Sequence, residues 1–117
     1  MNNLEDVLKD ILSLNGALAV SVVDWKSGMV LGTDTNKKFD IELASAGNSE
    51  VVKAKMATMA SLGLSGGIED ILITLTDQIH IIRILESNPD LFLYAAFDSS
   101  ANLALARNKM KTSSALL

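Results

Sequence analysis

Cysteine is absent from the 117 residues of this chain, which excludes disulfide bonds and thiolate metal sites. A chain without cysteine fits a reducing compartment, and we expect a cytoplasmic protein. Proline occurs once and glycine seven times, so the sequence contains no long flexible linker. With 49% apolar and 21% charged residues, the composition is that of a folded chain and not of a disordered or fibrous one.

Aromatic and basic residues are also scarce. One Trp and one Tyr accompany a net charge of -4 and a pI of about 4.8, whereas nucleic-acid binding requires a basic surface. No apolar run reaches the roughly 18 residues that span a bilayer. The first residues lack the basic and apolar segments of a secretory signal. We therefore expect no nucleic-acid partner and no membrane insertion.

The pattern of apolar residues and turn signals predicts one domain over residues 1–117. Apolar residues at helical spacing mark the helices, and runs rich in Val and Ile between turn residues mark the strands. Because neighbouring strands form hairpins, we expect an α/β (α+β) fold with a mainly antiparallel sheet and helices on its faces. In chain order the predicted elements are a helix between the Asn3 cap and Gly16, strands at 17–24 and 29–32, a loop at 33–38, a helix at 41–62, strands at 70–76, 79–85 and 91–97, and a last helix after Ser99 or Ser100 that frays over 113–117.

The central helix, residues 41–62, carries two apolar stripes on a helical wheel. A helix in a small domain needs only one such stripe to cover a sheet, so the second stripe is expected to pack against a further surface. One alternative is a helix buried on all sides, but 117 residues can hardly surround it. We assign the second stripe to a contact with another chain. The first stripe contains Leu43, Gly47, Val51, Ala54 and Leu62, and the second contains Ile41, Val52, Met56 and Met59.

Residues that could support catalysis or hold a cofactor are few. His80, the one histidine, lies in an aliphatic strand without a nucleophile or carboxylate beside it. The glycine-rich residues 64–67 follow a helix and lack the Gly-Lys-Ser/Thr of a phosphate loop. No carboxylate pair and no metal-ligand spacing stands out. We therefore expect no enzyme, no cofactor and no metal, and we interpret Asp70, Arg83 and Arg107 as solvated charges.

Several stretches, taken in order, resemble the roadblock/LC7 family and together cover about residues 4–111. No single stretch is as specific as a metal signature, so their joint order carries the resemblance. The last stretch favours a bacterial, actinobacterial member. The resemblance implies an α/β sandwich with a five-stranded antiparallel sheet. The stretches are 22–31 (VVDWKSGMVL), 46–56 (AGNSEVVKAKM), 68–75 (IEDILITL), 80–83 (HIIR), 91–94 (LFLY) and 101–107 (ANLALAR).

The resemblance also implies a homodimer in which the central helices lie against each other and the third strands pair edge to edge. Residues 71–75 are apolar and lack Pro and Lys, so a free edge there would invite aggregation. Pairing with a symmetry mate removes that hazard. Replacing Val52 with Asp is then expected to break the dimer. The expected dimer contacts are Ile41, Val52, Met56, Met59, Ile71, Ile73 and Leu75.

Members of this family are generally non-catalytic and serve as platforms or regulators for small Ras-like GTPases, so the resemblance implies a GTPase partner. No residue is an obvious arginine finger, so any stimulation of hydrolysis would arrange the GTPase's own groups. Two alternatives remain open: a structural adaptor that pairs with another roadblock-like chain, and a small-molecule or enzyme module with a pocket near His80. The candidate partner contacts are Glu42, Ser49, Lys53 and Met56.

Overall fold

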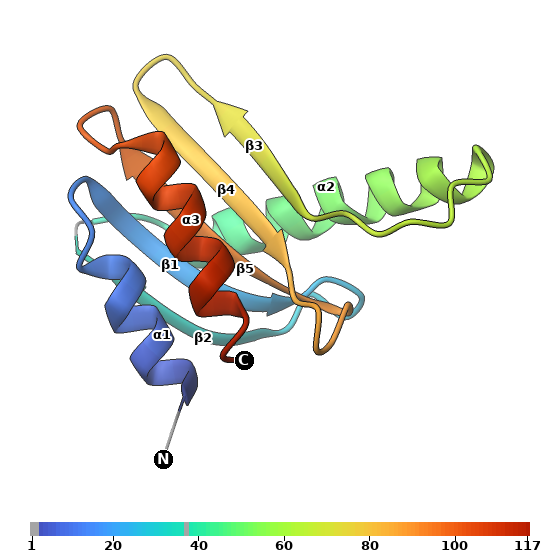
Figure 1. Ribbon diagram of the computed structural model, residues 1–117, viewed down its shortest axis with the longest axis horizontal. Coiled ribbons are helices and arrows are strands. Elements are labelled where there is room, and N and C mark those ends of the chain that lie inside the picture. The colour runs from blue at the N-terminus through green and yellow to red at the C-terminus, as the bar shows by residue number, and fades with distance from the viewer. Residues whose placement is uncertain (1–2, 37) are drawn as a thin grey trace.

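In the computed structural model, which describes residues 3–36 and 38–117, the chain forms a five-stranded antiparallel sheet with helices on both faces (Figure 1). The strands lie in the order β2-β1-β5-β4-β3, so β2 and β3 are the two edges of the sheet. This arrangement confirms the predicted fold class and order of elements. The elements are α1 (Asn3–Leu12), β1 (Ala17–Asp24), β2 (Val30–Thr35), α2 (Ile41–Ser61), β3 (Asp70–Thr74), β4 (Gln78–Ile84), β5 (Leu91–Asp98) and α3 (Leu103–Ser114).

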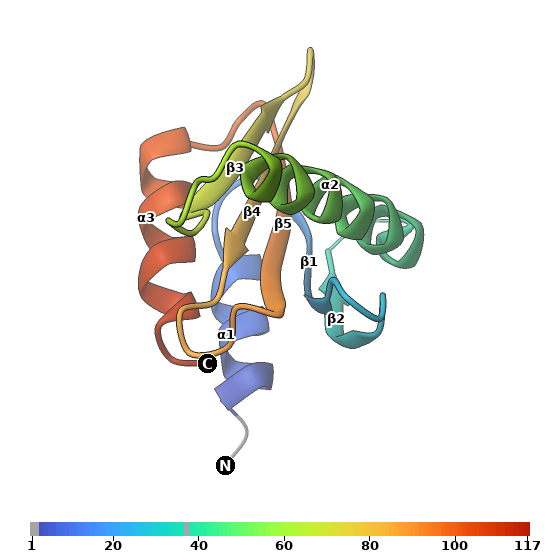
Figure 2. The ribbon, with the colours of Figure 1, turned by 90° about the vertical axis from the view of Figure 1, so that its right-hand side faces the viewer.

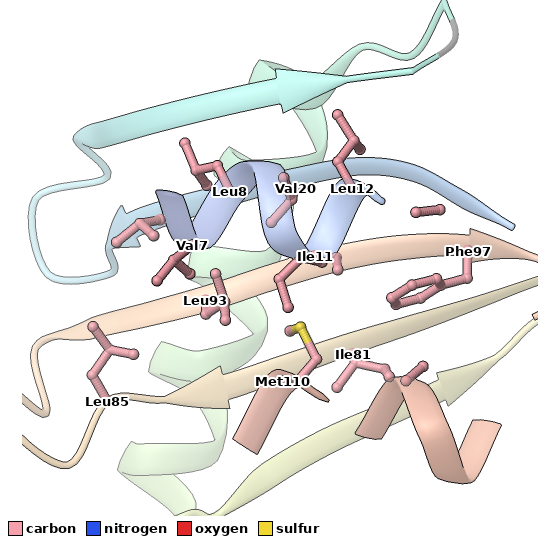
Figure 3. Close-up of a cluster of buried hydrophobic side chains, with 14 residues drawn as sticks. Val7, Leu8, Ile11, Leu12, Val20, Ile81, Leu85, Leu93, Phe97 and Met110 are labelled. Atoms are coloured by element: carbon pink, nitrogen blue, oxygen red, sulfur yellow. The ribbon is translucent and has the colours of Figure 1, made fainter. Parts of the chain in front are cut away.

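Helices α1 and α3 cover one face of the sheet, and α2 crosses the other face (Figure 2). Val7 and Ile11 of α1 and Met110 of α3 point onto Leu93 and Phe97 of β5 (Figure 3). All five side chains are buried. Full burial of such an apolar side chain contributes about 1.5–3 kcal/mol. This cluster anchors the first and last helices to the central strands.

A second apolar cluster lies between the sheet and α2. Val23, Ile82, Phe92 and Tyr94 contribute to it from the strands, and all four are inaccessible to solvent. The two central strands β1 and β5 are buried along nearly their whole length. Because both faces are covered, these strands contain runs of apolar residues rather than an alternating pattern.

The second strand is longer than the sequence predicts. β2 ends at Thr35 and not at Gly32, because Thr35 pairs with Ala19 of β1. β2 is an edge strand whose residues alternate between half-buried and exposed, so polar residues fit it as well as apolar ones. Residue 37 of the predicted loop lies outside the described residues.

The last helix differs from its prediction at both ends. It begins at Leu103, and the side chain of Asn102 accepts a hydrogen bond from the Leu105 backbone N–H at 3.0 Å, so the cap is neither Ser99 nor Ser100. Its end is not frayed, because Ser113 and Ser114 are buried. With its end buried, α3 packs over β4.

Candidate interaction surface

Helix α2 begins at Ile41, where the sequence predicts, and ends at Ser61, one residue before the predicted end. The Asp40 side chain accepts a hydrogen bond from the Leu43 backbone N–H at 3.0 Å, which satisfies one of the free donors of the first turn. After the last turn, Gly63 adopts a φ of 71°, a left-handed conformation that glycine adopts without steric cost. In between, the helix packs on β1 and β2. Figure 1 shows that its C-terminal half extends past the β3 edge of the sheet.

The inner face of α2 corrects the sequence prediction. Ile41 and Val52 are buried in the protomer's own core, and Val52 is fully inaccessible. They therefore face the sheet, and the prediction that they meet another chain is wrong. The roles of the two stripes are thus the reverse of the prediction. The prediction failed because the sheet-facing side also contains buried Ser45 and Ser49, and a search for apolar residues does not identify buried serines.

The buried serines explain how a partly polar helix face packs on the sheet. The Ser45 hydroxyl lies 2.9 Å from the Ser21 hydroxyl of β1 and donates to the Ile41 carbonyl at 2.6 Å. Ser49 donates to the Ser45 carbonyl at 3.0 Å. Each hydroxyl is satisfied by its own helix, so burial carries little penalty. These small side chains let the helix lie close to β1.

The first stripe is the one that faces solvent. Leu43 is 69% exposed, Val51 39% and Leu62 66%. Gly47 and Ala54 between them are also exposed, which leaves room for another backbone to approach closely. We call this set, Leu43, Gly47, Val51, Ala54 and Leu62, the outer stripe. An apolar surface of this kind on a small protein marks an interaction site.

Met56 and Met59 lie between the two faces of α2. Both are half-buried, and Met56 packs against the cluster beneath the helix. Methionine is unbranched and adapts its shape to different neighbours. Neither side chain is fully covered in the protomer.

Strand β3 is an open edge of the sheet. It pairs with β4 alone among the described strands, with Ile71 opposite Ile82 and Ile73 opposite His80. Ile71 and Ile73 are half-buried, and Leu75 is 44% exposed. Leu75 lies beyond the strand's end at Thr74, in the turn to β4. The outward backbone groups of β3 are thus available to another strand.

The candidate partner contacts do not share one surface. Glu42 is exposed, and Lys53 lies half-buried with its ammonium 3.7 Å from the Glu50 carboxylate. Ser49 is 2% exposed and faces the sheet, so its prediction as a partner contact is wrong. Met56 is half-buried and packs against the cluster beneath the helix.

His80 belongs to a hydrogen-bonded chain under α2. Its Nε2 lies 2.8 Å from Gln78 Oε1, and its Nδ1 lies 3.3 Å from the Tyr94 hydroxyl. Since the Gln78 oxygen can only accept, Nε2 carries the proton and Nδ1 accepts from Tyr94. Burial lowers the pKa of His80 and raises the pKa of Tyr94 to about 12. Both groups are therefore held neutral.

The three charged residues interpreted as solvated differ in exposure: Arg107 is exposed as expected, Asp70 is half-buried, and Arg83 is buried. Arg107 of α3 donates to both carboxylate oxygens of Asp70, at 2.8 and 3.1 Å. This hydrogen bonding and charge raise the pKa of Arg107. Arg83 of β4 is 7% exposed and lies on the α3 face. The sequence gives no signal for the Asp70–Arg107 pair, whose members are 37 positions apart.

Neither a metal site nor a membrane span is found in the part of the chain that the structure describes. Within residues 3–36 and 38–117, no three His, Cys, Asp or Glu side chains gather where they could hold a metal ion. None of the helices formed by these residues has the length and apolar character needed to cross a bilayer.

The chain is similar to several solved structures over nearly its whole length. Against MglB of Myxococcus xanthus the TM-score is 0.84 at 17% identity, covering 97% of this chain and 84% of that one. Against an MglB with a tetrameric arrangement it is 0.81 at 19% identity, covering 98% and 87%. Against a roadblock/LC7 domain from Streptomyces avermitilis it is 0.76 at 10% identity, covering 96% and 88%.

These likenesses establish the architecture. The chain has the roadblock/LC7 fold, as its sequence resemblance implies. No protein-family model matches the sequence, and no curated protein matches it. The resemblance is therefore carried by the backbone far more than by residue identity.

Proposed function

We propose that this chain is a non-catalytic roadblock/LC7 protein that acts as a homodimer and regulates or supports a small Ras-like GTPase. The observation that carries this proposal is the outer stripe of α2, which leaves apolar side chains exposed beside the open edge of β3. The protomer covers neither surface. A second copy, related by a twofold axis, can cover both at once.

The outer stripe supports the helix contact. Leucine and valine side chains alternate there with Gly47 and Ala54, so two antiparallel helices can approach closely and bury the leucines between them. The part of α2 that extends past the sheet has no strand of its own beneath it (Figure 1). A partner's sheet supplies the surface that this segment lacks.

The β3 edge supports the strand contact. Pairing of β3 with its symmetry mate would satisfy its outward backbone groups and would cover Ile71, Ile73 and Leu75. These three residues remain our proposed dimer contacts, together with Met56, Met59 and the outer stripe. Ile41 and Val52 are replaced by outer-stripe residues.

The comparisons support self-association and the family assignment. One MglB structure of the same fold has a tetrameric arrangement. The GTPase partner rests on the family resemblance. Glu42 and Lys53 stand on the accessible part of α2 and are the charged contacts we propose for that partner.

The dimer is tested by sedimentation of Val51→Asp. An aspartate in the outer stripe would place an unpaired charge in an apolar contact, so we expect a folded monomer. Thr33→Asp introduces the same charge on the opposite sheet edge and should stay dimeric. A fully dimeric Val51→Asp variant would show that α2 does not form the interface.

The GTPase partner is tested by a binding assay in which this protein captures small Ras-like GTPases whose genes lie next to its own. Each GTPase is loaded with GDP or with a GTP analogue. We expect binding in one nucleotide state, weakened by Glu42→Lys or Lys53→Glu. A correctly folded dimer that binds none of them in either state would contradict the GTPase assignment. Displacement of the homodimer by another roadblock-like chain in mixing experiments would instead show a structural adaptor.

A further inference from the structure

Arg83 carries a buried charge that is hydrogen-bonded to no carboxylate among the described residues, although Asp70 lies opposite it on β3 and is held by Arg107. Its side chain is 8% exposed, and its Nη2 lies 3.9 Å from the carboxylate of Glu86, which is itself 92% exposed. Its Nε has no hydrogen-bond partner among the described residues. A buried cation is costly unless it is well paired, and an exposed carboxylate at this distance offsets little of that cost.

Arg107, a short distance away on α3, shows the usual arrangement. Its Nε and Nη2 donate side by side to the two oxygens of Asp70. Such a two-pronged contact is the strong form of the arginine–carboxylate interaction. Arg83 presents the same pair of donors, but one has no partner and the other has only a distant one. The difference points to an anion that is not part of the chain.

Two cavities meet at Arg83. One, of about 450 Å³, lies between the end of β4 and the last turns of α3. The other, of about 310 Å³, lies between β4 and the middle of α3. Both are lined by Arg83 and Lys111, and Lys111 makes no ion pair within the described residues. Volumes of this size suit a small ligand.

Among the described residues, Arg83 and Lys111 are the lining cations without a hydrogen-bonded carboxylate. Thr112 donates to the Lys109 carbonyl at 3.3 Å, and exposed Asn108 is a further polar group of the second cavity. Asp70 is already held by Arg107. The hydroxyls of Ser87 and Ser114 donate to the carbonyls of Leu117 and Lys111, at 2.6 and 3.0 Å. Glu69 and Glu86 add negative charge at the rims, which favours a ligand with one compact anionic group over a large anion.

We propose that the groove between β4 and α3, centred on Arg83 and Lys111, binds the phosphate or carboxylate group of a small molecule. The Arg83 guanidinium holds the anion from the sheet side, and the Lys111 ammonium holds it from the helix side. This site lies on the face of the sheet opposite α2, so it is separate from the proposed dimer and GTPase surface. Its occupancy does not depend on that function.

The chain's two arginines, Arg83 and Arg107, make the test direct. Their Nε–Hε signals in a 15N-labelled sample give two reporters in the groove: Arg83 lines both cavities, and Arg107 lines the second while bound to Asp70. We expect inorganic phosphate to shift the Arg83 signal in a saturable way. Succinate is titrated in parallel, and sodium chloride at matched ionic strength serves as the control for screening. Saturation by phosphate alone assigns a phosphoryl ligand, and saturation by succinate alone assigns a carboxylate.

Two variants separate binding from general charge effects. Lys111→Gln removes an exposed cation without disturbing the core, and we expect about two- to fivefold weaker binding. Lys38→Gln removes an exposed lysine outside the groove and should bind as the parent does. A linear response of the Arg83 signal to both anions, or equal binding by the Lys111→Gln variant, would overturn the proposal. Because Lys111 is exposed, this result stands even if Arg83→Met fails to fold.

Discussion

At the scale of single residues, two neighbouring valines of α2 have opposite environments. Val52 is fully buried against the sheet, whereas Val51 is 39% exposed on the outer stripe. We predict that Val52→Asp lowers the free energy of unfolding by at least about 3 kcal/mol relative to Val51→Asp, because only position 52 forces a carboxylate into an apolar core. Urea unfolding of both variants at the same low protein concentration measures the difference.

The same pair decides which face of α2 covers the sheet. If the stripes were arranged as the sequence predicts, Val52→Asp would split the dimer into stable protomers, whereas Val51→Asp would unfold the protomer. Equal unfolding free energies for the two variants would show that the helix is rotated relative to the structure.

His80 predicts a pH dependence of stability. Burial lowers its pKa below the ordinary value of 6.5, and Tyr94 donates to its unprotonated Nδ1. The unfolded chain therefore takes up this proton at a higher pH than the folded protein does. The contribution of neutral His80 to stability is complete above pH 6.5 and is lost as the pH falls through the lower folded pKa.

Urea unfolding between about pH 7.5 and 5.5 checks the sign of this effect. The free energy of unfolding should fall toward the acidic end, and it should fall less in His80→Gln, which cannot take up the proton. The comparison removes the contribution of the carboxylates, which titrate in both proteins. An identical fall in both proteins would mean that His80 is not held neutral.

Single charged residues show where sequence reasoning ends. The sequence predicts that Asp70 and Arg107 are solvated, because Asp70 stands at the start of a strand and Arg107 on a charged face of the last helix. Arg107 is exposed as expected, but Asp70 is half-buried and paired with it. Their pairing requires β3 and α3 to meet, which only the folded sheet determines. The burial of Arg83 has the same cause, since α3 covers its side of β4.

At the scale of elements, the cap of α3 gives a discriminating test. The Asn102 side chain accepts from the Leu105 backbone N–H, whereas Ser99 lies in the turn before it. We predict that Asn102→Ala lowers the free energy of unfolding by about 1 kcal/mol. Ser99→Ala, one of the two caps expected from the sequence, should change it by less than about 0.5 kcal/mol. Urea unfolding measures both values. A larger loss of stability in Ser99→Ala than in Asn102→Ala would show that Ser99 caps the helix.

The elements themselves are largely predictable, and their faces are less so. β1 spans Ala17–Asp24 as predicted, since a valine-rich run between Gly16 and a turn has few other interpretations. The central helix is also found where expected. Its orientation is not, because its buried side contains serines that bond to their own helix. A helical wheel based on apolar residues treats these serines as exposed, so it selects the wrong face of the helix as the buried one.

At the scale of the whole molecule, the sheet has two edges that differ in kind. β2 alternates half-buried and exposed residues and ends in polar Thr33, Asp34 and Thr35. β3 has a similar burial pattern, but its centre is the apolar run Ile71, Leu72 and Ile73, and α2 extends past this edge of the sheet (Figure 1). Such asymmetry is typical of a protein that protects one edge by its sequence and the other by association. The protomer thus has one edge suited to pairing.

Hydrogen exchange at the two edges tests this asymmetry within one molecule. In the proposed dimer, outward amide groups of β3 become hydrogen-bonded, so their exchange should slow by at least about tenfold as the protein concentration rises through the dimer range. β2 is the internal control, and its exchange should not change. Val51→Asp should abolish the concentration dependence at β3. Slower exchange at β2, or a dimer by sedimentation with no change at β3, would place the twofold contact on another surface.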